Sequence, residues 1–131
     1  MFNEILYELD AQNKLLNGAT KLTKAVKSTL GPRGRNVIIE NDNTQLITKD
    51  GVTVARSIKL EDKFENIGAK LVSEVAIRTN DIAGDGTTTA IVIAHALLSE
   101  GQKLINEEKC DPIALKEGMD KALLAVVDEL K

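Results

Sequence analysis

The most apolar stretch of the chain runs from Ala90 to Leu98 and follows directly on the hexapeptide Gly84–Thr89, which reads GDGTTT. Apart from His95 this stretch is entirely apolar, and it is long enough to form a buried helix. A glycine turn that leads into a helix leaves free backbone N–H groups and the positive end of the helix dipole at the N-terminus. The sequence therefore predicts a helix over about 86–107 that lies at the centre of the fold.

The entrance to this helix suits a phosphate group, because free N–H groups and the helix dipole both favour an anion. The hydroxyls of Thr87–Thr89 add further donors. Asp85 would repel a phosphate unless a divalent cation, best Mg²⁺, lay between them. Local chemistry thus favours a metal-bound nucleoside phosphate, but it leaves open that these residues only begin a helix. No lysine follows Gly86, so the segment is not a Walker A loop.

Composition narrows the function classes. The chain has 131 residues, enough for one domain with a core, and 43% hydrophobic and 28% charged residues, as in soluble globular proteins. A net charge of −3 and only 2% aromatic residues argue against nucleic acid as a partner. No segment reaches the length of a membrane span, and residues 1–10 carry no basic signal region, so we expect no membrane partner. A cytoplasmic (bacterial) location, or an organelle of bacterial origin, fits this composition.

The chain has one cysteine and one histidine. Cys110 can form no internal disulfide, which suggests a reducing compartment, and its acidic neighbours do not favour a nucleophilic thiolate. His95 has no second histidine with which to bind a metal. We therefore expect a structural histidine rather than a catalytic one.

Apolar spacing predicts a helix over about 9–30, ended by the turn at 31–34. Two short strands at 36–40 and 45–48 would form a β-hairpin, and 52–58 a short helix. The expected core face of the first helix is Leu15, Ala19, Leu22, Val26 and Leu30.

A further helix is predicted over 62–82, and a last one beginning at Asp111-Pro112. The expected buried face of the 62–82 helix is Phe64, Ile67, Leu71 and Val75. The stripe of the last helix is Leu115, Met119, Leu123, Val126 and Leu130. This helix runs into Lys131 without a C-cap, so we expect a chain cut from a longer one. The predicted fold is mainly α, with four main helices and one small β-hairpin.

Three ordered motifs then carry a resemblance to a known family. They are Thr29–Asn36 (TLGPRGRN), Thr48–Val52 (TKDGV) and Ala83–Ala90 (AGDGTTTA). Together with Leu60–Asn66 (LEDKFEN), they resemble the group I chaperonins, the GroEL family, over about residues 15–131. The resemblance implies the N-terminal half of the equatorial ATP-binding domain for residues 1–131, with the apical and intermediate domains absent.

The resemblance also implies site residues and their cofactors, ATP and Mg²⁺, with K⁺ as a further ion. By it, Asp85 is the metal ligand, and Lys49 helps shape the phosphate and potassium site through its carbonyl. Asp50 would stand near the γ-phosphate and assist hydrolysis as the catalytic residue. The implied cofactor-binding residues are Thr29, Leu30, Gly31, Pro32, Lys49, Asp85, Gly86, Thr87, Thr88 and Thr89.

As a function, the resemblance implies part of an ATPase that folds proteins by ATP-driven encapsulation of unfolded polypeptide. The full-length parent would form a homo-oligomeric ring and take a co-chaperonin. Two departures, Gln12 in place of the usual arginine and the hairpin tip at 40–45 without the usual Phe-Gly-x-Pro element, concern segments outside the nucleotide motifs. The tip belongs to the family's ring-forming surface. The alternative functions are a helical interaction module with a silent phosphate loop and a free-standing small NTPase.

Overall fold

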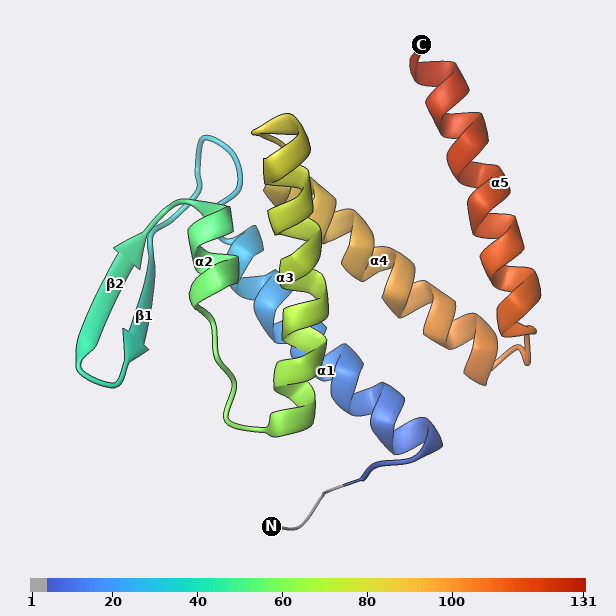
Figure 1. Ribbon diagram of the computed structural model, residues 1–131, viewed down its shortest axis with the longest axis horizontal. Coiled ribbons are helices and arrows are strands. Elements are labelled where there is room, and N and C mark those ends of the chain that lie inside the picture. Colours follow the sequence, from blue (N-terminus) through green and yellow to red (C-terminus); the bar gives the residue numbers. More distant parts are fainter. Residues whose placement is uncertain (1–4) are drawn as a thin grey trace. The chain divides into compact units, whose positions relative to one another are not determined.

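The computed structural model describes residues 5–131, which form five α-helices and one two-stranded sheet (Figure 1). The mainly helical fold with one small hairpin that the sequence predicts is confirmed. The chain divides into two compact units, one up to Leu97 and one from Leu98 onward, so α4 contributes to both. In chain order the elements are α1 (Glu8–Lys27), β1 (Val37–Asn41), β2 (Thr44–Thr48), α2 (Gly51–Ser57), α3 (Lys63–Ala83), α4 (Thr87–Asn106) and α5 (Pro112–Leu130).

Aspartates begin three of these helices. Asp50, Asp62 and Asp111 precede α2, α3 and α5, and each side chain accepts a hydrogen bond from a backbone N–H of the first turn. Such caps satisfy donors that have no partner within the helix. The expected start at Asp111-Pro112 is confirmed. The first helix ends at Lys27, before Leu30, because the chain turns there into the loop that leads to β1.

The hairpin pairs β1 with β2 in antiparallel register, from Val37 opposite Thr48 to Asn41 opposite Thr44. Its side chains alternate between two faces, as the period of a strand requires. Val37 and Ile39 pack against the core, whereas Ile38 is exposed. The hairpin predicted from the sequence is confirmed.

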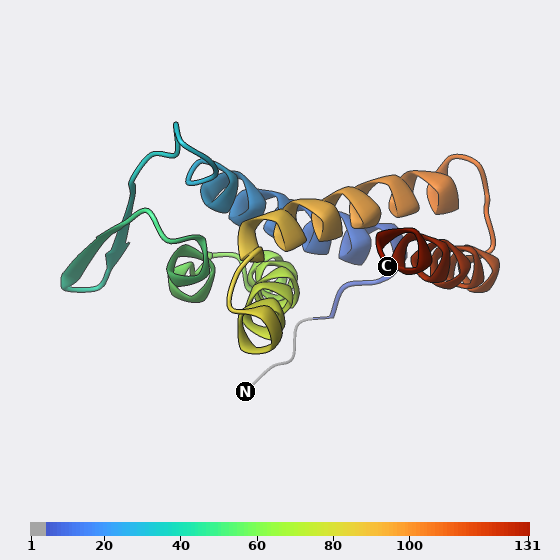
Figure 2. The ribbon, with the colours of Figure 1, turned by 90° about the horizontal axis from the view of Figure 1, so that it is seen from above.

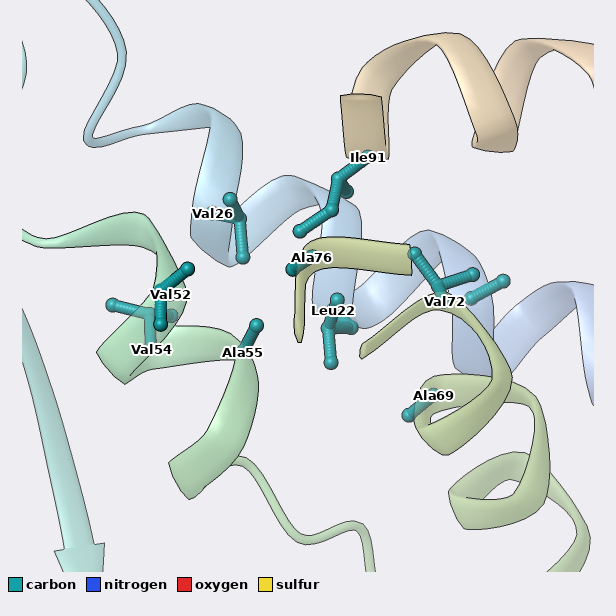
Figure 3. Close-up of a cluster of buried hydrophobic side chains, with 10 residues drawn as sticks. Leu22, Val26, Val52, Val54, Ala55, Ala69, Val72, Ala76 and Ile91 are labelled. Carbon is teal, nitrogen blue, oxygen red and sulfur yellow. The ribbon is translucent and has the colours of Figure 1, made fainter. Parts of the chain in front are cut away.

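The core of the first unit lies among α1, α2 and α3, and α4 adds a single side chain to it (Figure 3). Most of the buried side chains are small. They are Ala19, Leu22, Val26, Val52, Val54, Ala55, Ala69, Val72, Ala76 and Ile91. The expected face of the first helix is confirmed at Ala19, Leu22 and Val26; Leu15 is half-buried, and Leu30, beyond the helix end, is exposed.

Two glycines allow α1 and α3 to cross in direct backbone contact (Figures 1 and 2). A Cβ on Gly18 would lie 1.7 Å from the backbone oxygen of Glu65, and a Cβ on Gly68 would lie 2.0 Å from that of Leu15. Both distances are far below van der Waals contact, so only glycine fits at these positions. Ion pairs flank the crossing, with Lys14 Nζ 2.6 Å from Asp62 Oδ2 and Lys21 paired with Glu65.

This crossing explains why the predicted face of α3 is wrong. Ile67 and Leu71 are 48% and 52% exposed, and Phe64 and Val75 are only half-buried. The buried residues are Glu65, Gly68, Ala69, Val72, Ser73 and Ala76. Because the two backbones nearly touch, the facing side chains have to be small, and the large apolar residues lie on other sides of the helix.

The prediction that the 86–107 helix lies at the centre is also wrong. Within α4 only Ile91 is buried, and Ile93 and Leu97 are 54% and 50% exposed. The α1–α3 crossing occupies the centre of the first unit instead. Through Ile91 alone, α4 contributes a buried residue to this core.

The second unit contains the end of α4 and the whole of α5. No residue of α5 is buried, and of its predicted stripe only Leu115 is half-buried, so a buried face along this helix is not found. Leu115 meets the end of α4, where a Cβ on Gly101 would lie 3.6 Å from its Cδ2. Over residues 5–131 no helix combines the length and apolarity that crossing a membrane requires.

Candidate functional site

Three loops that are far apart in the sequence line one cavity of about 270 Å³ in the first unit. The loops follow α1, precede α2 and precede α4. The lining residues are Thr29, Leu30, Gly31, Lys49, Asp50, Gly51, Asp85, Gly86, Thr87, Thr88 and Thr89. The structure thus brings together all the residues that the sequence suggested for the site except Pro32, which does not line the cavity.

The first loop leaves α1 through a tight turn. The N–H of Thr29 donates to the carbonyl of Val26 at 3.0 Å, and the Thr29 hydroxyl donates to the same oxygen at 2.6 Å. Thr29 is therefore buried and fixed, while Leu30 is 47% exposed and offers an apolar surface at the cavity. Gly31 has a positive φ of 76°, which lets the chain reverse direction.

The second loop is fixed by Asp50. Its Oδ2 accepts hydrogen bonds from the N–H and the hydroxyl of Thr53, at 3.2 and 2.5 Å, and so caps α2. Its own N–H donates to the Thr48 hydroxyl at 3.1 Å. Asp50 therefore has a structural role as the N-cap of α2, whatever its chemical role. The first turn of this helix holds its carboxylate at the cavity.

The third loop enters α4 through Gly84 and Gly86, which both have positive φ, and between them Asp85 is exposed. The Oδ1 of Asp85 accepts a hydrogen bond from the N–H of Gly86 at 2.7 Å, so one carboxylate oxygen is held by the loop and the other is available to a cation. The first regular bond of α4 joins Ala90 N–H to the Gly86 carbonyl. The N–H groups of the first turn thus have no helical partner, and they belong to residues that line the cavity.

Gly51 was not among the predicted site residues, although it lies in one of the three motifs. It is buried at the start of α2, where a Cβ would lie 2.4 Å from Thr88 Oγ1 and 3.3 Å from Val26 Cγ1. Its lack of a side chain therefore lets the ends of α1 and α2 and the start of α4 meet. A glycine directly after a capping aspartate was the available signal.

The donor set fits a metal-bound phosphate better than a metal alone. The cavity wall carries two carboxylates, Asp50 and Asp85, and one ammonium group, Lys49. Among the described residues, no group of three or more His, Cys, Asp or Glu side chains could hold a metal ion by itself. Mg²⁺ is often bound by one or two carboxylates together with phosphate oxygens, and this wall supplies the protein part of such a set.

Comparison with known proteins agrees with this geometry. A model of the TCP-1/cpn60 chaperonin family matches residues 22–131, which include all three loops. The chain therefore belongs to the TCP-1/cpn60 chaperonin family.

Among solved structures, two crystal forms of the chaperonin gp146 from the bacteriophage EL 2 (Pseudomonas aeruginosa), determined in the presence of ATP-BeFx, resemble this chain. Each is 41% identical in sequence, and the TM-scores are 0.65 and 0.64. The match covers 70% of this chain and 17% of the phage chaperonin, so the chain corresponds to a small part of that protein.

Proposed function

We propose that this chain is the N-terminal half of the equatorial domain of a group I chaperonin and that its cavity binds Mg²⁺-ATP. The observation that carries the proposal is the meeting of three distant loops around one polar cavity at the N-terminus of α4. Support comes from the related phage chaperonin, which was crystallised in the presence of ATP-BeFx.

The proposed roles follow from the chemistry of each loop. The N–H groups and hydroxyls at Gly86–Thr89 bind phosphate oxygens, because they are free donors at the positive end of a helix. Asp85 holds Mg²⁺, which removes the repulsion between its carboxylate and the phosphates. Lys49 helps shape the phosphate and K⁺ site, and the loop at 29–32 contacts the nucleotide, with Leu30 as its apolar surface.

Asp50 is the residue proposed to assist hydrolysis. Its Oδ2 accepts hydrogen bonds from Thr53, which positions the carboxylate at the cavity, where it can accept a hydrogen bond from a water. In the family a further carboxylate downstream activates the water. We therefore propose that this chain alone binds nucleotide but turns it over negligibly.

In the intact subunit, nucleotide binding would drive the folding cycle. ATP shifts a ring between two states by binding them with different affinity, and the ring encloses unfolded polypeptide together with a co-chaperonin. These activities belong to the full-length parent, of which the chain represents a small part. The alternative, a helical interaction module with a silent cavity, shares the fold and differs only in whether nucleotide binds.

Calorimetric titration of the chain with ATP distinguishes a nucleotide-binding domain from an interaction module with a silent cavity. We expect binding in the presence of Mg²⁺, and affinity at least tenfold weaker after chelation of Mg²⁺, a change of about 1.4 kcal/mol. Asp85→Asn should reproduce the weak binding with Mg²⁺ present, because it removes the charged ligand without changing side-chain size.

Asp81→Asn is the matched control, because Asp81 is an exposed aspartate near the end of α3 that does not line the cavity. This variant should bind like the unmodified chain. No binding by the folded chain would favour the interaction module. An unchanged affinity of Asp85→Asn for Mg²⁺-ATP would contradict the assignment of Asp85 as the Mg²⁺ ligand.

A further inference from the structure

We infer that His95 is a positioning residue: by hydrogen bonding to Thr20 of α1, it sets the rotation of α4 and so directs the threonine hydroxyls of that helix into the cavity. The inference rests on the proposed function of the cavity, because its consequence is measured there. His95 does not line the cavity itself.

Within the described part of the first unit, α4 is held by few side chains. Ile91 is its one buried residue. One turn further on, the Nε2 of His95 lies 2.9 Å from the Oγ1 of Thr20. Thr88 precedes Ile91 by three residues, so Thr88, Ile91 and His95 share one face of the helix. Along this face lie a residue of the cavity wall, Thr88, then the buried Ile91, and then His95 with its hydrogen bond to α1.

Burial of Ile91 alone cannot fix the rotation of α4 about its axis, because hydrophobic contact has no preferred direction. A hydrogen bond does have a preferred direction, and the bond of His95 lies one turn away from Ile91. Without it, α4 could turn about Ile91, and Thr88 would move relative to Gly51, where the two chain segments are in close contact. His95 thus acts on the cavity through the orientation of its own helix.

The direction of the hydrogen bond can be worked out. The Thr20 hydroxyl has one hydrogen, and it is donated to the carbonyl of Leu16 at 2.8 Å. With this hydrogen donated to Leu16, we assign the Thr20 oxygen as the acceptor from His95, which places a hydrogen on Nε2 of the imidazole. The inference thus fixes a tautomer as well as a contact.

The functional test is a double-mutant cycle on the full chain, with Mg²⁺-ADP affinity as the readout. His95→Leu and Thr20→Val should each weaken binding about fivefold, the loss of about one net hydrogen bond. The double variant should be no weaker than either single one, because both remove the same bond. His95→Gln should bind nearly like the unmodified chain, because glutamine offers an N–H donor at similar reach.

Thr23→Val is the matched control. Thr23 also lies on α1, but its hydroxyl donates to the Ala19 carbonyl of the same helix, at 2.7 Å. The variant should leave Mg²⁺-ADP affinity unchanged. Far-UV circular dichroism of each variant shows whether it is folded, and Thr20→Val, which removes the same bond, keeps the test valid if His95→Leu fails to fold.

Nuclear magnetic resonance gives a second readout that needs no nucleotide. Because the chain has a single histidine, a two-bond ¹H–¹⁵N spectrum contains the signals of one imidazole. A hydrogen on Nε2 is expected from the contact with Thr20, and an imidazole whose Nε2 carries no hydrogen would overturn the inference. Equal Mg²⁺-ADP affinity in all variants would overturn it as well, whereas absence of binding in the unmodified chain would overturn the proposed function and, with it, this consequence.

Discussion

Gly51 at the start of α2 lies against Thr88 in the first turn of α4, so closely that a Cβ on Gly51 would stand 2.4 Å from the Thr88 Oγ1. The two residues are far apart in sequence and belong to different loops of the cavity. Their contact restricts the space around a threonine hydroxyl that we propose binds phosphate. The packing of the two helix starts is thereby part of the site.

Gly51→Ala should therefore weaken Mg²⁺-ATP binding about tenfold, about 1.4 kcal/mol, because the methyl group displaces the Thr88 side chain. The effect on stability should be small, since the side chain can rotate and alanine is favourable in a helix. Calorimetric titration and thermal unfolding measure the two quantities. Gly118→Ala is the control: a Cβ there would meet nothing within 4 Å, so nucleotide affinity should not change.

Much of the fold could be predicted from residues that begin and end elements. Asp111-Pro112 marked a helix start, Gly31–Gly34 a helix end, and the short β-branched run of Val37, Ile38 and Ile39 a strand. These signals are local, and the structure agrees with them. The packing could not be predicted in the same way, because it depends on which helices approach one another.

The wrongly predicted buried face of α3 shows why the packing could not be predicted. Large apolar side chains such as Ile67 and Leu71 suggested the buried face, whereas the actual face is built around Gly68, Ala69 and Ala76. Small residues permit the backbone contact with α1, but they give a weak hydrophobic signal. For the cavity, only the loop at 84–89 was predicted from local chemistry, and the other two loops came from the family resemblance.

The α1–α3 crossing gives a prediction for stability. Gly68→Ala should destabilise the chain by about 3 kcal/mol or more, because its Cβ would meet the backbone oxygen of Leu15, which cannot rotate away. Urea unfolding followed by circular dichroism measures the change. Gly118→Ala again serves as the control and should stabilise the chain slightly. A Gly68→Ala variant as stable as the unmodified chain would show that the helices can separate without loss.

The Lys14–Asp62 pair predicts a dependence on pH. The hydrogen bond from Lys14, together with that from the Glu65 N–H, lowers the pKa of Asp62 below its ordinary value. The hydrogen bond between Lys14 and Asp62 also raises the pKa of Lys14. Because an unfolded aspartate has a pKa of about 3.9, the stabilising contribution of Asp62 is fully present above that value and is lost as pH falls through the lower folded pKa. Asparagine also caps helices, so Asp62→Asn tests the charge alone.

Asp62→Asn should be less stable than the unmodified chain at pH 7, and the difference should shrink below about pH 4. Thermal unfolding across this range gives the comparison. Asp81→Asn, which removes an exposed carboxylate of the same helix, should have little effect at either pH. A difference between Asp62→Asn and the unmodified chain that stays constant down to pH 2 would contradict the assignment.

The exposed apolar residues of α5 predict self-association of the chain. Leu123, Leu124 and Leu130 are 61%, 67% and 82% exposed, and exposed apolar surface of this kind drives association. Size-exclusion chromatography with light scattering should show small or irregular oligomers, which Leu123→Lys combined with Leu130→Lys should reduce. Glu117→Lys on the same helix is the charge control. A monomer with a sharp thermal transition would disprove the prediction.

Mapping the backbone amide signals of the ¹⁵N-labelled chain during titration with Mg²⁺-ATP tests whether the three loops form one nucleotide site. Saturable shifts should appear together at Thr29–Gly31, Lys49–Gly51 and Asp85–Thr89, and they should be much smaller when Mg²⁺ is chelated. Signals from α5 should not change. Shifts confined to one loop, shifts centred elsewhere, or none at all in the folded chain would contradict a shared Mg²⁺-ATP site.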